Sequence, residues 1–254
     1  MFVRSSGTKG SPSGDSPHAL YCLKRADVHK DLAAFRRIAE DIAELGKVGV
    51  HGRAARRRAR TVLEMFGGSG WHSAVIADVV KPKKHRILEN SLECLDSLRR
   101  SLPEADIVHA DSFEAARGRF GKSSYDWIHA DFNQFTLKRA LDDPAYKGVL
   151  SGIFTQAELY VTITDSAVFG VKRFAGNREA YAKLLRVDIK DELDYFKAAA
   201  AYYSKLYDFG MQRVITWDGM ASMYLLRRGY NPSSALVVER QKKAADVRII
   251  GNET

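Results

Sequence analysis

The stretch 59–75, ARTVLEMFGGSGWHSAV, places a carboxylate beside a glycine-rich loop. Gly67, Gly68 and Gly70 allow the backbone to approach a ligand closely, and Glu64 stands just before them. The loop follows an apolar run and precedes a helical pattern, which is where ligands bind in open α/β sheets. The segment therefore predicts a ligand site beyond the carboxyl end of a first strand.

Two kinds of ligand suit such a loop. GSGWHS imitates the phosphate-binding pattern G-x-G-x-x-A, with Ser73 as the small third residue. However, the Glu64 carboxylate would repel a pyrophosphate and would attract a cationic amino acid group. S-adenosylmethionine has an ammonium, a sulfonium and no phosphate. We therefore expect S-adenosylmethionine as the cofactor, with a nicotinamide dinucleotide as the alternative.

Short apolar runs alternate with helical patterns from Thr61 onward. The runs TVLEMF, HRILEN, DIVHAD, YDWIHADF and LYVTIT are typical of strands, and helical segments such as SLECLDSLRRSL lie between them. Near the end, MQRVITWDGMASMYLLRRG predicts two strands joined by a turn. The predicted fold is α/β and doubly wound, with a mostly parallel seven-stranded sheet that ends in a C-terminal antiparallel hairpin.

The first motif resembles that of the class I S-adenosylmethionine-dependent methyltransferases, an acid followed by x-F/G-x-G-x-G. Glu64, Phe66, Gly68 and Gly70 fall on its positions. The resemblance covers about 61–229 and implies that Glu64 and the loop Gly67–Gly70 hold the methionine part of the cofactor.

Two further acids end successive strands, as in this family. Glu89, with Asn90 beside it, would accept hydrogen bonds from the ribose hydroxyls. Asp111 would take the adenine amino group, with Ser112 next to the ring. Three acids in this order strengthen the resemblance, although each alone could cap a helix.

The end of the fourth strand reads Asp131-Phe132-Asn133-Gln134-Phe135. Methyltransferases of base amino groups have D/N-P-P-aromatic here, so the acid and the last aromatic match while both prolines are missing. The resemblance implies that Asp131, Asn133 and Phe135 are catalytic. In the alternative, Asp131 caps a helix and the phenylalanines pack in the core, which would suit an inactive binding or structural protein on a methyltransferase scaffold.

Basic residues are concentrated before the first strand. The net charge is +9, and HGRAARRRAR contains Arg56, Arg57, Arg58 and Arg60 with no acid among them. Such a run commonly contacts phosphates, so we expect a nucleic acid, DNA or RNA, as the partner. A solvated linker is the alternative, and a protein or small-molecule acceptor stays open, as does the oligomeric state.

The remaining expectations concern organisation. We expect a disordered tail at 1–17, a helical and basic extension at 18–60, a methyltransferase-like domain at 61–240 and a tail at 241–254. No apolar run reaches the length of a membrane span, and two separated cysteines favour a reducing compartment, so a soluble, cytoplasmic protein is expected. No metal is expected, because His109 and His129 lack a second ligand at metal spacing.

Overall fold

The structure is a computed structural model. It describes the residues in the following ranges: 25–45, 59–68, 70–115, 124–131, 144–166, 179, 182–183, 186–190, 194–195, 197–198, 201–202, 207, 209–217, 220–227 and 237–240.

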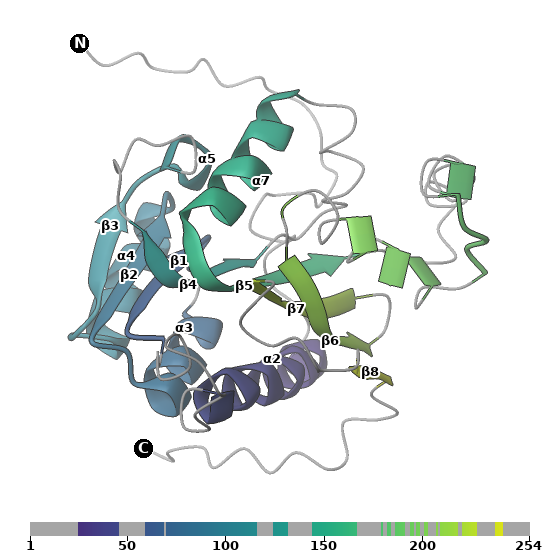
Figure 1. Ribbon diagram of the computed structural model, residues 1–254. Coiled ribbons are helices and arrows are strands. Elements are labelled where there is room, and N and C mark those ends of the chain that lie inside the picture. The colour runs from purple at the N-terminus through teal and green to yellow at the C-terminus, as the bar shows by residue number, and fades with distance from the viewer. Residues whose placement is uncertain are drawn as a thin grey trace, which may run out of the picture.

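A mostly parallel sheet forms the centre of the molecule (Figure 1). Its order is β3-β2-β1-β4-β5-β7-β6-β8, where β1 to β5 are parallel, β7 is antiparallel to both β5 and β6, and β8 is parallel to β6. The prediction of an α/β fold with a mostly parallel sheet is confirmed, with eight strands in the described part of the chain where seven were expected. The strands are β1 Thr61–Met65, β2 Lys84–Glu89, β3 Asp106–His109, β4 Tyr125–Asp131, β5 Ala157–Ser166, β6 Phe209–Trp217, β7 Met220–Arg227 and β8 Val237–Arg240.

The chain changes direction across the sheet between β1 and β4. After β1 it moves outward to β2 and β3, and then it returns to β4 on the other side of β1. The change of direction therefore lies between the neighbouring strands β1 and β4, and doubly wound sheets bind ligands at the carboxyl ends of such a pair.

Helices cover both faces of this sheet (Figure 1). Helix α7 packs on one face and α2 on the other, while α3 continues directly into the π-helix η1 on the face of α2. None of the described helices is both long and apolar enough to cross a bilayer. The helices are α2 Arg25–Leu45, α3 Trp71–Val75, η1 Ile76–Val80, α4 Leu92–Ser101, α5 Ser112–Glu114 and α7 Pro144–Gln156.

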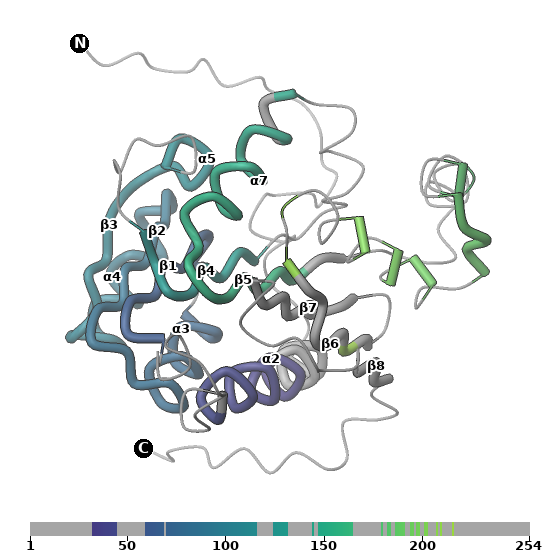
Figure 2. The backbone as a smooth tube through the Cα atoms, in the orientation of Figure 1, coloured from purple at the N-terminus to yellow at the C-terminus, as the bar shows by residue number. Residues whose placement is uncertain are grey.

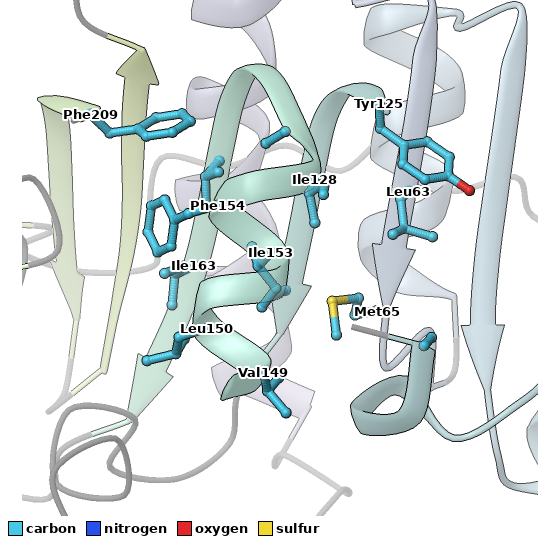
Figure 3. Close-up of a cluster of buried hydrophobic side chains, with 14 of the residues drawn as sticks. Leu63, Met65, Tyr125, Ile128, Val149, Leu150, Ile153, Phe154, Ile163 and Phe209 are labelled. Carbon is cyan, nitrogen blue, oxygen red and sulfur yellow. The ribbon is translucent and has the colours of Figure 1, made fainter. Parts of the chain in front are cut away.

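The core on the α7 face is built from alternate residues of the central strands. Strand residues two apart point to the same face, so Leu63 and Met65 of β1 share this side. Figure 3 shows the side chains of α7 lying over those of the strands. The labelled members from α7 are Val149, Leu150, Ile153 and Phe154, and those from the parallel strands are Leu63, Met65, Tyr125, Ile128 and Ile163.

The core on the opposite face is completed by α2. Phe35, Ile38 and Ile42 recur at helical spacing and are fully buried against Val62 and Trp127. Each such side chain contributes about 1.5–3 kcal/mol through burial. Figure 2 shows α2 running beside α3, the helix that follows the glycine-rich loop. Helix α2 lies within the segment 18–60, where a helical extension was expected, and it forms one layer over the same sheet as β1.

Candidate active site

The loop after β1 has a backbone that requires small residues. Gly68 has a φ of 51° and Gly70 a φ of 80°, both in the left-handed region that favours glycine. A Cβ on Gly67 would lie 2.4 Å from Cγ2 of Ile87, and one on Gly70 would lie 2.8 Å from Leu98 Cδ2. Among the described residues, a Cβ on Gly68 would meet nothing nearer than the backbone oxygen of Phe66 at 3.8 Å. Gly67 and Gly70 therefore pack inward, whereas Gly68 faces open space.

Phe66 takes a conformation that is unusual for its type. Its φ is 62°, which costs a residue with a side chain about 1–2 kcal/mol. Its N–H donates to Oγ of Ser112 at 3.1 Å, and its ring meets that of Phe113 edge to face with centroids 5.3 Å apart. These contacts help offset the backbone cost. They also give the buried Ser112 hydroxyl a part in holding the loop, which the sequence did not indicate.

Glu64 lies within the protein beneath this loop. Its side chain is 2% exposed, its Oε1 accepts a hydrogen bond from Ser73 Oγ at 2.8 Å, and its Oε2 lies 3.1 Å from Nε2 of His85. The carboxylate thus ties the start of α3 to β2. The sequence suggested direct contact with a ligand, whereas the structure shows both oxygens engaged by protein groups.

Glu89, at the end of β2, stands beside the loop. Its Oε2 accepts a hydrogen bond from the N–H of Gly68 at 2.6 Å, and its Oε1 accepts one from Ser91 N–H at 2.7 Å. The carboxylate therefore lies next to the glycine that faces open space. The neighbouring Asn90 is exposed, and its carbonyl oxygen is 3.1 Å from Nε2 of His109.

Asp111 follows β3 and is exposed. Its Oδ1 accepts hydrogen bonds from the N–H groups of Phe113 and Glu114, at 2.7 and 3.1 Å, so it caps the short helix α5. The cap fixes the direction of the carboxyl group at the carboxyl end of the sheet.

Asp131 ends β4 on the same edge of the sheet. Its side chain is 37% exposed, and its Oδ2 lies 3.7 Å from Nδ1 of His72, the second residue of α3. The other predicted catalytic residues, Asn133 and Phe135, lie outside the described residues, as do Arg56, Arg57 and Arg58.

Two buried histidines adjoin Asp131, and the sequence did not connect them. His72 Nδ1 and His129 Nε2 are 2.9 Å apart, although 57 positions separate the residues. Burial, with His72 and His85 nearby, holds the pKa of His129 well below its ordinary value. The only sequence signal was that His129 and Asp131 are two apart on one strand. In the part of the chain that the structure describes, no three potential metal ligands are grouped to hold an ion.

The site as a whole presents carboxylates along one edge of the sheet. Glu89 and Asp131 end β2 and β4, Asp111 follows β3, and these parallel strands share the edge at which they end. Carboxylates accept hydrogen bonds from hydroxyl, amino and ammonium groups and repel phosphates. This set of acceptors suits a cationic ligand with hydroxyl groups and does not suit a pyrophosphate.

The comparisons with known proteins concern the fold. No model of a known protein family matches the sequence, and no curated protein matches it either. The plantazolicin methyltransferase BpumL was solved in complex with S-adenosylhomocysteine (SAH). It superposes with a TM-score of 0.54 at 11% identity, over 83% of this chain and 89% of that one. The chain has the class I methyltransferase fold.

Two other solved structures superpose less closely on this chain. The magnesium protoporphyrin IX methyltransferase ChlM from Synechocystis PCC 6803, with bound SAM, gives a TM-score of 0.46 at 13% identity, over 82% of this chain and 88% of that one. The sugar N-methyltransferase KedS8 from Streptoalloteichus sp ATCC 53650 gives 0.43 at 17% identity, over 67% of this chain. This chain spans 62% of the length of KedS8.

Proposed function

We propose that the protein is an S-adenosylmethionine-dependent methyltransferase. The observation that carries this proposal is the placement of Glu89 against Gly68, the one loop glycine that faces open space. Each oxygen of this carboxylate already accepts one backbone N–H and has a second lone pair, with which it could accept a ribose hydroxyl in that space. When bound, the cofactor supplies a methyl group on a positively charged sulfur.

The roles proposed for the described residues rest on where those residues lie, and the roles of Asn133 and Phe135 rest on the sequence motif alone. Glu89 takes the ribose, Asp111 takes the adenine amino group, and the backbone around Gly68 receives the methionine part. Glu64 supports the loop from beneath, because its side chain is 2% exposed and side chains of the protein, Ser73 and His85, already meet both of its oxygens. Asp131 is partly exposed at the end of β4 and orients the methyl acceptor, together with Asn133 and Phe135.

We infer that the acceptor is a nucleic acid, with a base amino group favoured. Arg60, Lys83 and Lys84 are exposed where β1 and β2 begin, and the N–H of Lys84 donates to the carbonyl of Arg60 at 3.0 Å. The segment with Arg56, Arg57 and Arg58 leads directly into this basic edge. This basic edge is opposite the edge at which the cofactor would bind. The cations would therefore contact backbone phosphates of the nucleic acid and would not touch the target base.

Cofactor binding is tested by isothermal titration calorimetry with S-adenosylhomocysteine (SAH). Glu89→Ala should weaken binding by about ten- to a hundredfold, because a charged hydrogen-bond acceptor is lost. Glu104→Ala removes the same charge from an exposed turn and should leave the affinity unchanged. Thermal unfolding of both variants shows whether the fold is intact. Absence of heat at millimolar SAH would exclude the cofactor, and fluorescence of reduced nicotinamide dinucleotide then tests the alternative.

The acceptor is tested with tritiated cofactor offered to total RNA, DNA and protein fractions. Label should enter a nucleic-acid fraction. Label in protein alone would show a protein methyltransferase, and SAH binding without label in any macromolecular or small-molecule fraction would favour an inactive scaffold.

The basic segment is tested by replacing Arg56, Arg57 and Arg58 with alanine. Each phosphate contact adds close to one unit to the slope of log affinity against log salt, so this slope should flatten by about two to three units. SAH affinity should not change. Equal nucleic-acid affinity and salt slope in the parent and the variant would identify the segment as a solvated linker.

A further inference from the structure

A line of polar side chains runs from the acceptor end of the site into the sheet. Asp131 Oδ2 lies 3.7 Å from Nδ1 of His72, and this Nδ1 lies 2.9 Å from Nε2 of His129. Nδ1 of His129 meets the Thr162 hydroxyl at 2.8 Å, and the Trp127 indole N–H donates to the same oxygen at 2.9 Å. The line thus joins α3, β4 and β5.

The middle of this line is closed off from solvent. The His129 side chain has no exposed surface, and His72 is 5% exposed. Phe35 of α2 stacks on the His72 ring with centroids 4.2 Å apart and lies 4.4 Å from the His129 ring. In such an environment, charges and hydrogen positions influence one another more strongly than they do in water.

The chemistry of the groups restricts where the hydrogens can be. Only one hydrogen can lie between the facing nitrogens of His72 and His129. An indole N–H can only donate, so the Thr162 oxygen accepts from Trp127. Burial, followed by the neighbouring His72 and His85, lowers the pKa of His129 well below its ordinary value, so its ring is neutral and carries one hydrogen at neutral pH.

Two arrangements satisfy these restrictions. In the first, His72 donates from Nδ1 to His129, which donates from its own Nδ1 to Thr162. In the second, both hydrogen bonds are reversed, and the lone pair of His72 Nδ1 lies 3.7 Å from the Asp131 carboxylate. A negative charge at that distance favours a hydrogen on Nδ1, and therefore the first arrangement.

Two other charged groups near the pair, within the part of the chain that the structure describes, have opposite charges as neighbours. His85 of β2 lies 3.1 Å from the Glu64 carboxylate of β1. Arg36 of α2, next to Phe35, pairs with Asp78 of η1 at 2.9 Å. We therefore expect Asp131 to set the direction of the hydrogen bonds.

We propose that His72 is a positioning residue: its Nδ1–H, donated to Nε2 of His129, places the positive edge of the imidazole 3.7 Å from the Asp131 carboxylate and so favours the ionised carboxylate that faces the methyl acceptor. The buried His129 and Thr162 keep the His72 hydrogen on Nδ1. The inference rests on the proposed function, in which Asp131 orients the acceptor. Phe35 gives α2 a part in this arrangement, because it covers both imidazole rings.

The first test is nuclear magnetic resonance of the histidine nitrogens in the full chain. At about pH 7.5, above the ordinary histidine pKa, long-range ¹H–¹⁵N spectra should show the hydrogen of His129 on Nδ1 and a hydrogen on Nδ1 of His72. Asp131→Asn should shift the population toward the second arrangement. Asp126→Asn, the same change at the other end of β4, should leave these signals unchanged. A hydrogen on Nε2 of His129 in the parent, or no response to Asp131→Asn, would overturn the inference.

The second test compares His72→Asn with His72→Leu in methyl transfer. The asparagine amide can replace the Nδ1–H donor, whereas leucine cannot. We expect His72→Leu to lower kcat about a hundredfold with unchanged SAH affinity, and His72→Asn to recover at least about tenfold of that loss. Equal losses in the two variants would overturn the role of His72. Failure of the parent to bind SAH would overturn the proposed function, and the acceptor-positioning role with it, whatever the nuclear magnetic resonance spectra show.

Discussion

Gly67→Ala should destabilise the protein because its Cβ has no room. The added carbon would lie 2.4 Å from Cγ2 of Ile87 and 3.4 Å from Cδ1 of Leu98. Carbon atoms pack best at about 3.5–4.0 Å, so Ile87 or the loop must move by about 1 Å. Ile87 is fully buried and β-branched, which leaves it few alternative rotamers. Overpacking of this kind costs about 1–3 kcal/mol of unfolding free energy.

The matched control is Gly148→Ala, the same substitution on the exposed side of α7. In the described part of the chain, no atom lies within 4 Å of the Cβ position there. Alanine is more favourable than glycine inside a helix by about 0.8–1.0 kcal/mol. The assay is urea unfolding monitored by circular dichroism. The urea concentration at the midpoint should be lower for Gly67→Ala and higher for Gly148→Ala than for the parent, and the slope of unfolding free energy against urea should not change. An unchanged midpoint for Gly67→Ala would show that the loop does not pack on Ile87 as described.

Three further predictions test other parts of the structure. Gly68→Ala should weaken SAH binding measured by calorimetry, because its Cβ enters the open space in front of the loop; unchanged affinity would place the ligand elsewhere. Asp126→Ala should cost about 1–3 kcal/mol in urea unfolding, because its Oδ2 accepts hydrogen bonds from the backbone N–H groups of Arg60 and Thr61. Burial lowers the pKa of His129 in the folded protein. As the pH falls below 6.5, His129 therefore takes up a proton more readily in the unfolded chain than in the folded one. Unfolding free energy should then fall by up to about 1.4 kcal/mol per pH unit, and His129→Gln should remove that part of the pH dependence.

The glycine-rich loop shows how far a local pattern can be interpreted. Glycines after an apolar run predicted a ligand loop at the end of β1, and the left-handed φ values of Gly68 and Gly70 agree with the need for glycine. The sequence could not show that Gly67 is required for packing, because Ile87 approaches it from another strand.

For the acidic residues, too, the sequence predicted the position along the chain but not all of the contacts. Their places in or after apolar runs were enough to predict that Glu89, Asp111 and Asp131 lie at or just after the ends of strands of one parallel sheet. The environment of Glu64 was not predictable in this way, because it depends on Ser73 and His85 meeting its two oxygens.

The sequence by itself determined the order of strands and helices and the acids at the strand ends, because these features depend on residues near one another in the chain. Only the tertiary structure decided that α2 covers one face of the sheet, and that His72 and His129 meet beneath Phe35. Such contacts join residues 37 to 94 positions apart. They arise from the packing of whole elements, which is set by the combined shape and apolar surface of those elements and not by any local spacing.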